Sequence, residues 1–354
     1  MRNLSTLKFL NNKIGWLYLL SGGFVLSTAL LGLFISSVQV PVSTILHIII
    51  DKSLSLGWLE DIAKNEEMII WNIRLPRVLL AFCVGASLAL AGSAFQGLLR
   101  NPLADPYTIG VSSGASLGAV FVLFFQVTIV GLGNFTLPIV AIVSGFITLL
   151  IVFGLVRLSS RILAIETIIL AGIIVSAFIG AIVSLIISLS DKDSMSQIIY
   201  WLYGSVGMRG WSHVQLIVPF MLLGSIILFF HYRELNALAL GEDAADHIGV
   251  DVKKGKTYIL IGASLLTGAA VAVSGSIGFV GLVIPHLVRL VTGPNHRYVL
   301  PLSMFVGGGF LILADLVSRT IIAPKELPIG VITALIGAPV FALLLIKERI
   351  GRRG

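Results

Sequence analysis

The chain has 354 residues, of which 57% are hydrophobic and 12% charged, and its formal net charge is +7. Soluble domains are roughly 45–50% apolar and about 25% charged, so too little polar surface remains here to cover a water-soluble globule. This composition excludes a soluble enzyme and a disordered chain, and the single cysteine, Cys83, excludes a disulfide scaffold. Basic residues lie between apolar runs, so the positive charge indicates a membrane protein and not a nucleic-acid binder.

Ten apolar segments have the composition of membrane-spanning helices. A helix that crosses the ~30 Å hydrocarbon core needs about 20 mostly apolar residues, which predicts an all-α, polytopic membrane protein with about ten transmembrane helices. The predicted spans are 16–38, 78–99, 108–130, 137–156, 166–189, 213–232, 257–274, 276–291, 299–321 and 327–346. The eighth is short and contains Gly281 and Pro285, which leaves either a full crossing or a broken or buried element open. No soluble domain fits between the spans, so residues 1–354 are interpreted as one integral membrane domain.

The distribution of basic residues predicts the orientation. With the N-terminus inside, 16 of the 24 Lys and Arg residues fall in inner segments, which by the positive-inside rule places both termini in the cytoplasm. Trp58, Trp71, Trp201 and Trp211 then lie at or near the outer boundary, where amphipathic rings favour the headgroup region. The first apolar run is longer than the core of a secretory signal and is interpreted as a retained helix.

Ionisable residues are nearly absent from the predicted spans. Asp315 in the ninth span is the single acidic candidate, and Arg319 follows one helical turn later, where the two side chains can pair. Because intramembrane carboxylates usually mark ion or proton sites, their scarcity disfavours a carrier that is driven by an ion gradient.

Small residues recur at helical spacing in two spans. Gly110, Gly114 and Gly118 form a doubled G-x-x-x-G face that allows close helix contact. The fifth span carries a stripe at the same period, Gly172, Ser176, Gly180, Ser184 and Ser188. From periodicity alone, this stripe favours packing against a neighbouring helix over lining a path through the membrane.

No catalytic or metal-binding motif is found. The run from Gly249 to Thr257 has five residues between Gly249 and Gly255, whereas a phosphate-binding loop needs four, and it is interpreted as a basic turn beside the membrane. The six histidines show no ligand-like spacing, and Cys83 is interpreted as a small core residue. The chain is therefore expected to be no enzyme and to bind no cofactor or metal by itself.

The inner loop at 233–256 contains a predicted short helix. Glu242 and Asp243 suit the positive N-terminal end of such a helix, and Gly249 suits a left-handed cap. Leu238 and Leu240 are apolar neighbours of this acidic cluster, which a simple linker would not require. The loop is therefore interpreted as a docking element for a partner in the cytoplasm.

Several motifs resemble one family. They are, in chain order, Arg-Leu-Pro-Arg at 74–77, Gln96, Arg-Asn-Pro-Leu-Ala-Asp-Pro at 100–106, Gly-Val-Ser-Ser-Gly-Ala at 110–115, Leu-Asn-Ala-Leu-Ala-Leu-Gly at 235–241, Gly-Phe-Val-Gly-Leu-Val-Ile-Pro-His at 278–286, Glu-Leu-Pro-Ile-Gly-Val at 326–331 and Gly-Ala-Pro-Val-Phe at 337–341. With these motifs the chain resembles the FecCD-type permeases, membrane subunits of ATP-binding-cassette (ABC) importers for iron chelates and cobalamin. The resemblance implies the type II ABC importer permease architecture.

The resemblance also implies partners. It places the chain beside a second permease chain, identical or paralogous, with two cytoplasmic ATP-binding subunits that use ATP and Mg, and with an extracytoplasmic substrate-binding protein. The assembly lies in the bacterial cell membrane among lipid, and no nucleic acid is involved.

The resemblance implies three sets of site residues. The ATPase-coupling set is Leu240, Gly241, Glu242, Asp243, Ala244, Ala245, Ile248 and Gly249. The arginines that dock the binding protein are Arg74, Arg77 and Arg319. The resemblance also moves the stripe of the fifth span, Gly172 to Ser188, toward the translocation pathway.

These expectations define one function and its alternatives. The chain is predicted to be the permease subunit of an ATP-driven importer of ferric siderophores. A haem or cobalamin importer of the same family is the first alternative, and an ion-coupled secondary carrier is a more distant one. A channel or a purely structural membrane protein would not need the docking element at 233–256.

Overall fold

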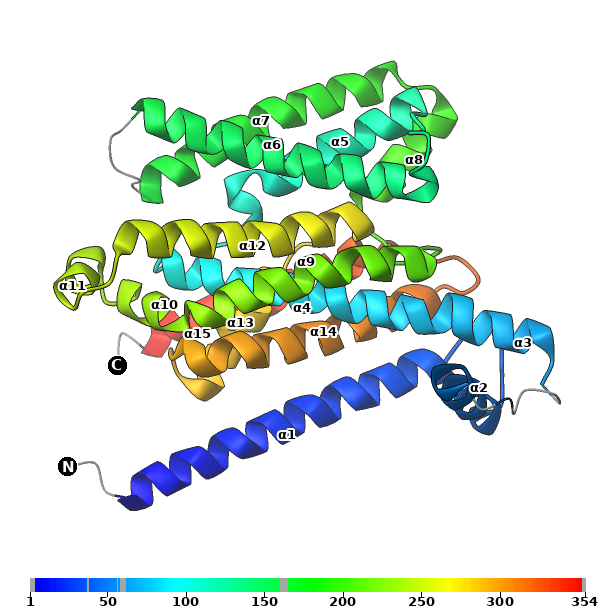
Figure 1. Ribbon diagram of the computed structural model, residues 1–354, viewed down its shortest axis with the longest axis horizontal. Coiled ribbons are helices and arrows are strands. Elements are labelled where there is room, and N and C mark those ends of the chain that lie inside the picture. Colours follow the sequence, from blue (N-terminus) through cyan, green and yellow to red (C-terminus); the bar gives the residue numbers. More distant parts are fainter. Residues whose placement is uncertain (1–3, 37, 56, 58–61, 160–164, 352–354) are drawn as a thin grey trace.

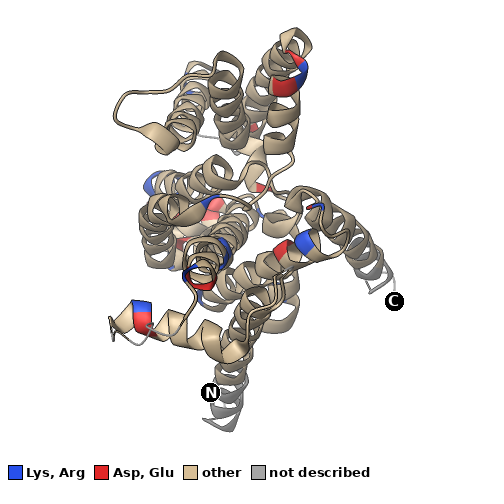
Figure 2. Ribbon diagram, turned by 90° about the vertical axis from the view of Figure 1, so that its right-hand side faces the viewer, with Lys and Arg blue, Asp and Glu red and all other residues tan. Residues whose placement is uncertain are grey.

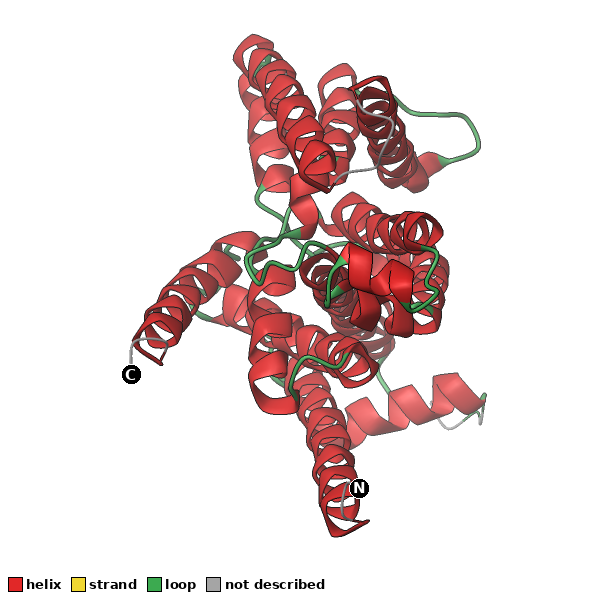
Figure 3. Ribbon diagram, turned by 90° about the vertical axis from the view of Figure 1, so that its left-hand side faces the viewer, coloured by secondary structure: helices red, strands yellow, loops and turns green. Residues whose placement is uncertain are grey.

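The computed structural model describes residues 4–36, 38–55, 57, 62–159 and 165–351 as helices joined by loops, with no strand in these ranges (Figures 1 and 3). In chain order the elements are α1 (Leu4–Phe34), α2 (Val42–Leu54), α3 (Lys64–Met68), the π-helical turn η1 (Ile69–Arg74), α4 (Leu75–Leu98), the 3₁₀ turn η2 (Pro106–Ile109), α5 (Val111–Phe125), the 3₁₀ turn η3 (Gly133–Phe135), α6 (Thr136–Ser159), α7 (Ile165–Leu189), α8 (Lys192–Leu202), α9 (Gly210–Phe230), α10 (Tyr232–Leu238), α11 (Glu242–His247), α12 (Val252–Ser274), α13 (Val280–Thr292), α14 (His296–Thr320) and α15 (Ile329–Gly351). The all-α fold class is confirmed.

The long helices form three tiers in Figure 1. Helices α5, α6 and α7 lie together at the top of this view, α4, α9, α12, α13 and α14 form the middle, and α1 runs along the bottom against α14. Both chain termini lie at the end of the bundle that carries α11, and α2, α3 and α8 lie at the opposite end. We call these the α11 end and the α2 end. Which end faces the cytoplasm stays a prediction.

Helix α4 is the centre of the fold. In the 18-residue apolar window of the helical stretch Lys64–Leu98, 89% of residues are buried, against 22% in the corresponding window of α1. Small residues make this possible: a Cβ on Gly85 would lie 2.3 Å from the carbonyl oxygen of Gly307 in α14, and one on Gly92 would lie 1.9 Å from that of Gly281 in α13. Glycines at these crossings let the helix backbones touch.

Seven helices are long and apolar enough to cross a membrane, and α5, α13 and the apolar part of α15 are shorter apolar helices; both statements concern the described residues. Together they correspond to the ten predicted spans. The second predicted span, 78–99, begins too late, because the helix already starts at Lys64 and includes the Arg-Leu-Pro-Arg motif that was expected to precede it.

Two other predicted spans are wrong in length. At 1.5 Å per residue the 13 residues of α13 reach about 20 Å, so this helix cannot cross a ~30 Å core by itself. The expectation of a broken or buried element at 276–291 describes it better than a full crossing. Helix α5 has 15 residues and starts after η2, so it is also shorter than the predicted 108–130.

The tryptophans separate into two kinds. Trp71 and Trp211 meet at the α2 end, with ring centroids 5.3 Å apart, and the indole Nε1–H of Trp211 donates to the Trp71 carbonyl oxygen at 2.8 Å. Trp201 of α8 is only 4% exposed, so its ring packs inside the protein and not among lipid headgroups, while its place on the outer side stays a prediction. Trp58 lies outside the described residues.

Candidate functional site

Three arginines gather at the α2 end, as the resemblance implies. Arg77 in the first turn of α4 donates from Nε to both carboxylate oxygens of Asp315 in α14, at 3.0 and 3.1 Å. Its two terminal nitrogens donate to the two carboxylate oxygens of Glu326, at 2.8 and 2.9 Å. One guanidinium therefore makes bidentate contacts with two carboxylates, the geometry for which its planar fork is suited.

The expected pair of Asp315 and Arg319 is present but secondary. The Nε atom of Arg319 lies 3.5 Å from Asp315 Oδ2, whereas Arg77 Nη2 lies 2.9 Å from Oδ1. Asp315 is 1% exposed, and burial of a carboxylate is tolerable when cations and hydrogen bonds satisfy it. The main partner of Asp315 is thus Arg77, 238 residues away in the chain.

The other two arginines hold the end of α1. Arg74 donates to the carbonyl oxygen of Leu33 at 3.1 Å and to that of Val38, and Arg319 donates to that of Gly32. The last carbonyls of a helix lack partners within it and carry the negative end of its dipole. These contacts therefore explain how Arg74, at 3% exposure, remains buried with its charge.

A polar cavity of about 260 Å³ opens beside this cluster, and its walls include Arg74, Arg77, Arg319 and Glu326. The hydrogen bonds from Arg77 lower the pKa of Glu326 below its usual value. Figure 2 views this end and shows sparse charge, with acidic and basic positions adjoining. The three arginines share one site, and each already contacts acceptors of its own chain, so their docking role stays a prediction.

The stripe of small residues on α7 is divided by its surroundings. Gly172 packs against η2, because a Cβ there would lie 2.4 Å from the carbonyl oxygen of Thr108, and Ser176 borders Gly110. Gly180 borders a cavity, and Ser184 and Ser188 are exposed. The first half of the stripe thus serves helix packing, and the second half is open.

The cavity beside Gly180 has a volume of about 360 Å³. Its walls carry no charged side chain and are lined by Tyr107, Ser112, Ser113, Ser116, Ile179, Gly180, Val183, Leu202 and Ser276. The hydroxyl of Tyr107 donates to the carbonyl oxygen of Ile277 at 2.8 Å and accepts from its N–H at 3.1 Å. We call this space the hydroxyl-lined cavity.

The doubled G-x-x-x-G face makes the close contact that its spacing predicts. A Cβ on Gly114 would lie 2.0 Å from Thr148 Oγ1, and one on Gly118 would lie 2.4 Å from Ser144 Oγ, both in α6. Gly110 instead faces α7, where a Cβ would lie 3.2 Å from Ser176 Oγ. The packing of α5 on α6 leaves its serine face free to line that cavity.

The inner loop contains the predicted short helix, α11. Gly241 precedes it with φ +121°, and Gly249 follows with φ +85°, the left-handed cap expected there. The Val250 N–H donates to the Ala245 carbonyl oxygen at 3.0 Å, which closes this cap. The run from Gly249 to Thr257 is not a turn along its whole length, because α12 begins in it at Val252. The Asp251 side chain caps this helix by accepting the Lys254 N–H.

The predicted coupling residues present different surfaces. Leu240 and Ile248 are 74% and 65% exposed, whereas Ala245 is buried. Asp243, Ala244 and Gly249 are exposed. Glu242 forms an ion pair with Lys256 of α12, so it also fixes α11 to the bundle. The loop thus offers two apolar side chains on a short helical projection.

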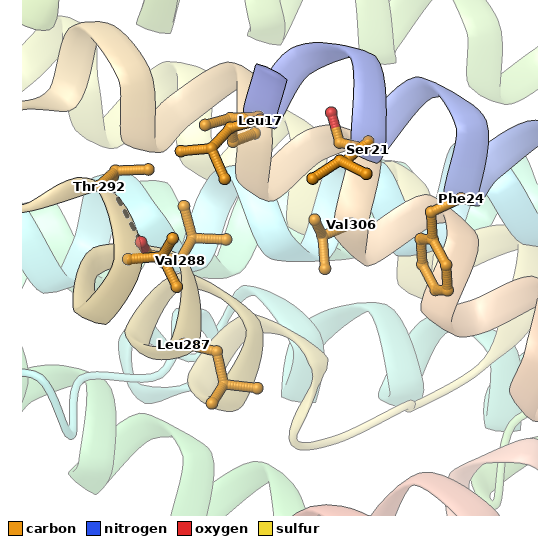
Figure 4. Close-up of a pocket in the computed structure, with 10 residues that line it drawn as sticks. Leu17, Ser21, Phe24, Leu287, Val288, Thr292 and Val306 are labelled. Atoms are coloured by element: carbon orange, nitrogen blue, oxygen red, sulfur yellow. Dashed lines mark hydrogen bonds between the residues drawn. The ribbon is translucent and has the colours of Figure 1, made fainter. Parts of the chain in front are cut away.

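A third space lies between α1, α13 and α14 and is almost wholly apolar (Figure 4). Its volume is about 350 Å³, and Leu17, Phe24, Leu287 and Val306 are among its walls. Such walls offer few hydrogen bonds to a polar solute.

In the described part of the chain, no group of three His, Cys, Asp or Glu side chains could hold a metal ion.

Sequence reasoning missed a second polar cluster, at the α11 end. Gln96, Arg289, His296 and Asn236 are joined by hydrogen bonds; Gln96 and His296 are buried, and Arg289 and Asn236 are partly exposed. In the sequence, Gln96 stands out only as part of a family motif, and His296 is only one of six scattered histidines. The available signal was Pro285: a proline inside a buried helix leaves a carbonyl without its N–H donor, so a polar side chain must come from elsewhere.

Comparison with known proteins gives the family. The model of the FecCD transport family matches residues 24–347. The ABC transporter permease protein YvrB of Bacillus subtilis is 50% identical over 100% of this chain and 99% of its own length. The hemin transport permease HmuU of Yersinia pestis is 41% identical over 85% of this chain and 91% of its own, and relatives of similar identity are named for cobalamin and molybdate import.

A solved structure described as an inward-facing conformation of a metal-chelate type ABC transporter superposes with a TM-score of 0.81. It is 36% identical and covers 94% of this chain and 98% of its own. The ten apolar helices, the helical projection at α11 and these matches agree. The chain therefore belongs to the FecCD transport family and is the permease subunit of an ABC importer.

Proposed function

We propose that this permease carries ferric siderophores. The observation that supports this substrate class is the hydroxyl-lined cavity, in which four serines stand on uncharged walls. A ferric siderophore is bulky and rich in oxygen atoms, and hydroxyl groups can hydrogen-bond to it in turn. Charged walls would bind such a ligand more tightly and slow its release.

The arrangement of the sites supports the following transport cycle. A binding protein docks at the α2 end and releases the chelate into the space between two permease chains. ATP binding and hydrolysis, with Mg, occur in two separate subunits that contact α11. Movement of α11 then changes which end of the cavity is open, with the second half of the α7 stripe along the path.

Contact with the ATPase is carried by the exposed side chains of Leu240 and Ile248. Apolar side chains that stand out in water are typical of interfaces. Leu240→Ser and Ile248→Ser together should leave the permease folded, because neither side chain is buried, and should abolish co-purification of the ATPase subunits. Leu343→Ser, an exposed apolar position on α15, is the control. Unchanged co-purification would contradict the coupling role.

Docking of the binding protein must compete with contacts inside the permease. Glu326 occupies the Arg77 guanidinium, so a carboxylate of the binding protein would have to replace it. Glu326→Gln should therefore strengthen docking at low salt, and Arg77→Gln should weaken it. Binding of the candidate protein to the permease in nanodiscs measures both, with Glu67→Gln on α3 as control. Equal affinities for all variants would remove the arginines from the docking surface.

Haem, cobalamin and molybdate are the alternative substrates, since relatives are named for them. An ion-coupled carrier is the weakest alternative, because both oxygens of Asp315 accept hydrogen bonds from Arg77. A carboxylate held in this way is poorly suited to accept and release ions during transport.

One uptake experiment separates these functions. Proteoliposomes contain the permease, its co-purifying ATPase and a candidate binding protein, and they receive iron-55 siderophore with or without ATP. ATP-dependent accumulation that excess siderophore abolishes, but haemin, cobalamin and molybdate do not, supports the proposal. Competition by one of those three instead names that substrate. Uptake that ignores ATP and stops with the ion gradient would overturn the importer mechanism.

The pathway is tested at Gly180. A Cβ there meets open space, so Gly180→Leu should fold normally and fill part of the hydroxyl-lined cavity. Uptake should fall while ATPase assembly is retained. Gly154→Leu on α6, also in open space, is the matched control. Undiminished uptake in Gly180→Leu would place the path elsewhere.

A further inference from the structure

A continuous path of side-chain hydrogen bonds links α10, just before α11, to the first turn of α13. Its members come from four helices: Asn236 of α10, His296 of α14, Arg289 of α13 and Gln96 of α4. Gln96 and His296 are each 2% exposed. The path lies at the α11 end, which Figure 3 views directly, and runs from partly exposed Asn236 to buried Gln96.

At α13 the path replaces a missing backbone hydrogen bond. Pro285 has no N–H, so the Gly281 carbonyl lacks its usual helical donor. The Gln96 amide Nε2 donates to the carbonyl oxygens of Gly281 at 3.4 Å and Leu282 at 2.9 Å. The first turn of α13 is thus held in part by a side chain of another helix, beside the backbone bond from the Val283 N–H to the Phe279 carbonyl oxygen at 2.8 Å.

In the middle of the path lies a cation with neutral partners. Arg289 donates to Gln96 Oε1 at 2.9 Å, to the Ser93 carbonyl oxygen at 3.0 Å and to His296 Nε2 at 3.3 Å. Among the residues that the structure describes, no carboxylate lies within ion-pair distance of Arg289. A guanidinium can only donate, so His296 Nε2 is the acceptor and the ring hydrogen is on Nδ1.

At α10 the path reaches the inner loop. The His296 Nδ1–H donates to Asn236 Oδ1 at 2.9 Å, and the same oxygen accepts the backbone N–H of His296 at 2.8 Å. The amide nitrogen of Asn236 donates to Asn295 Oδ1 at 2.9 Å. Asn236 lies four residues before Leu240, so these bonds connect the inner loop with the start of α14.

The other end of the path adjoins the hydroxyl-lined cavity. Phe279, directly before α13, has φ +68°, which is rare for a residue with a side chain. Ile277 is bonded to Tyr107 through both its carbonyl and its N–H, and Ser276 is part of the cavity wall. A shift of the first turn of α13 would therefore move that wall.

We propose that the Asn236–His296–Arg289–Gln96 path transmits movement of the inner loop to the first turn of α13 and to the wall of the hydroxyl-lined cavity. The inference rests on the proposed contact of α11 with the ATPase. A helix turn that lacks an internal hydrogen bond is a natural hinge, and neutral partners can be exchanged with less penalty than the two carboxylates of Arg77. The four residues are positioning residues.

Two variants disturb the path in different ways. Arg289→Lys keeps the charge and removes the fork that holds Gln96 and His296 together. Gly97→Ala adds a methyl group that would lie 2.3 Å from His296 Nε2. The matched controls are Arg297→Lys, at an exposed arginine of α14, and Gly154→Ala, whose added Cβ meets nothing within 4 Å.

The experiment measures movement with spin labels and does not depend on the substrate. In a Cys83→Ala background, labels are attached at Gly278→Cys, where a Cβ meets open space, and at Leu223→Cys on α9, which is 52% exposed. The permease and its ATPase subunits are placed in nanodiscs, and label distances are compared with and without ATP. ATP should shift the distance in the background protein and both controls, and not in Arg289→Lys or Gly97→Ala. Co-purified ATPase shows that each variant is assembled.

Two results would overturn the proposal: no ATP-dependent shift in the background protein, or a full shift in both path variants. A double-mutant comparison adds a second measurement, since Gly97→Ala should have no further effect once His296→Ala has removed the ring it displaces. In the uptake assay, substrate carried per ATP hydrolysed should fall about tenfold in the path variants. Failure of the wild-type protein to carry siderophore would contradict the substrate and leave the spin-label result intact.

Discussion

Arg77 at the α2 end and Arg289 at the α11 end are both largely withdrawn from solvent, but they are held in opposite ways. Arg77 contacts two carboxylates through bidentate bonds. Arg289 contacts an amide oxygen, a backbone carbonyl and an imidazole nitrogen. The first arrangement ties α4 to α14 and to the loop that follows it, and the second joins four helices through neutral groups.

The difference separates a fixed cluster from one that can be rearranged. Removing one partner of a buried ion pair leaves an uncompensated charge, so the α2-end cluster resists change. Neutral hydrogen-bond partners can be replaced by other neutral groups with a smaller penalty. Stability should therefore depend more on the Arg77 cluster, and coupling between ATP hydrolysis and transport more on the Arg289 path.

The largest expected effect breaks the fixed cluster. Asp315→Asn leaves Arg77 and Arg319 without their buried carboxylate and should destabilise the permease by about 3–5 kcal/mol. Detergent-solubilised protein unfolded by SDS measures this. The double variant Arg77→Met, Asp315→Leu should recover part of the loss, because Arg77 is removed together with its main carboxylate partner and Arg319 is then the buried group that loses an ion-pair partner. If Asp315→Asn lowers the free energy of unfolding by less than about 1 kcal/mol, the ion pair of Arg77 with Asp315 contributes no more than an exposed salt bridge.

The next effect concerns the contact beneath the Arg289 path. Gly92→Ala places a methyl group 1.9 Å from the Gly281 carbonyl oxygen, which is backbone and cannot turn away. Forced separation of α4 and α13 should destabilise the permease by roughly 1–3 kcal/mol. It should also lower uptake per folded permease molecule. The same SDS titration and the uptake assay measure both. Gly23→Ala on α1, where a Cβ meets open space, should be neutral, and equal behaviour of the two variants would show that this crossing is not tight.

The smallest effect is pH-dependent and sharpens the description of the Arg77 cluster. Hydrogen bonds from Arg77 lower the folded-state pKa of Glu326. Its contribution to stability is therefore fully present above the unfolded pKa and is lost as pH falls through the folded pKa.

This contribution can be isolated by thermal unfolding between about pH 6 and about pH 3. The wild-type midpoint should fall more than that of Glu326→Gln over this range. The difference should stay below about 1 kcal/mol, because the Glu326 side chain is 37% exposed and solvent screens it. Parallel curves for the two proteins would mean that the ion pair of Glu326 with Arg77 adds nothing to stability.

Local sequence patterns anticipated much of this structure. Apolar runs located the ten apolar helices of the described residues but neither α2 nor α8, which lie between predicted spans. G-x-x-x-G spacing located the contact of α5 with α6, and acidic residues followed by Gly249 located α11. They failed where a helix departs from the bilayer-spanning length. Residues 64–77 are more polar than a typical span, yet they belong to the same continuous helical stretch as the rest of α4. Helix α13 is shorter than predicted because residues 275–279 form a loop between α12 and α13.

The functional clusters show the same division. Arg74, Arg77 and Arg319 could be grouped through family motifs, but Glu326 as a partner of Arg77 could not. The sequence indicates a single stripe of small residues on α7. In the fold Gly172 packs against η2, whereas Gly180 borders the hydroxyl-lined cavity. The Arg289 path escaped notice because amides, imidazoles and carbonyls leave no charge pattern in the sequence.

The sequence by itself determined an all-α membrane protein, the approximate positions of its apolar helices and the loop that presents α11, because hydrophobicity and helix capping depend on neighbouring residues. Only the tertiary structure decided that Arg77 meets Asp315, that Gln96 supplies the hydrogen bond that Pro285 cannot, and that α13 ends short of a full crossing. These outcomes join residues that are remote in the chain. Their hydrogen bonds depend on the close approach of α4 to α13 and α14 at glycines.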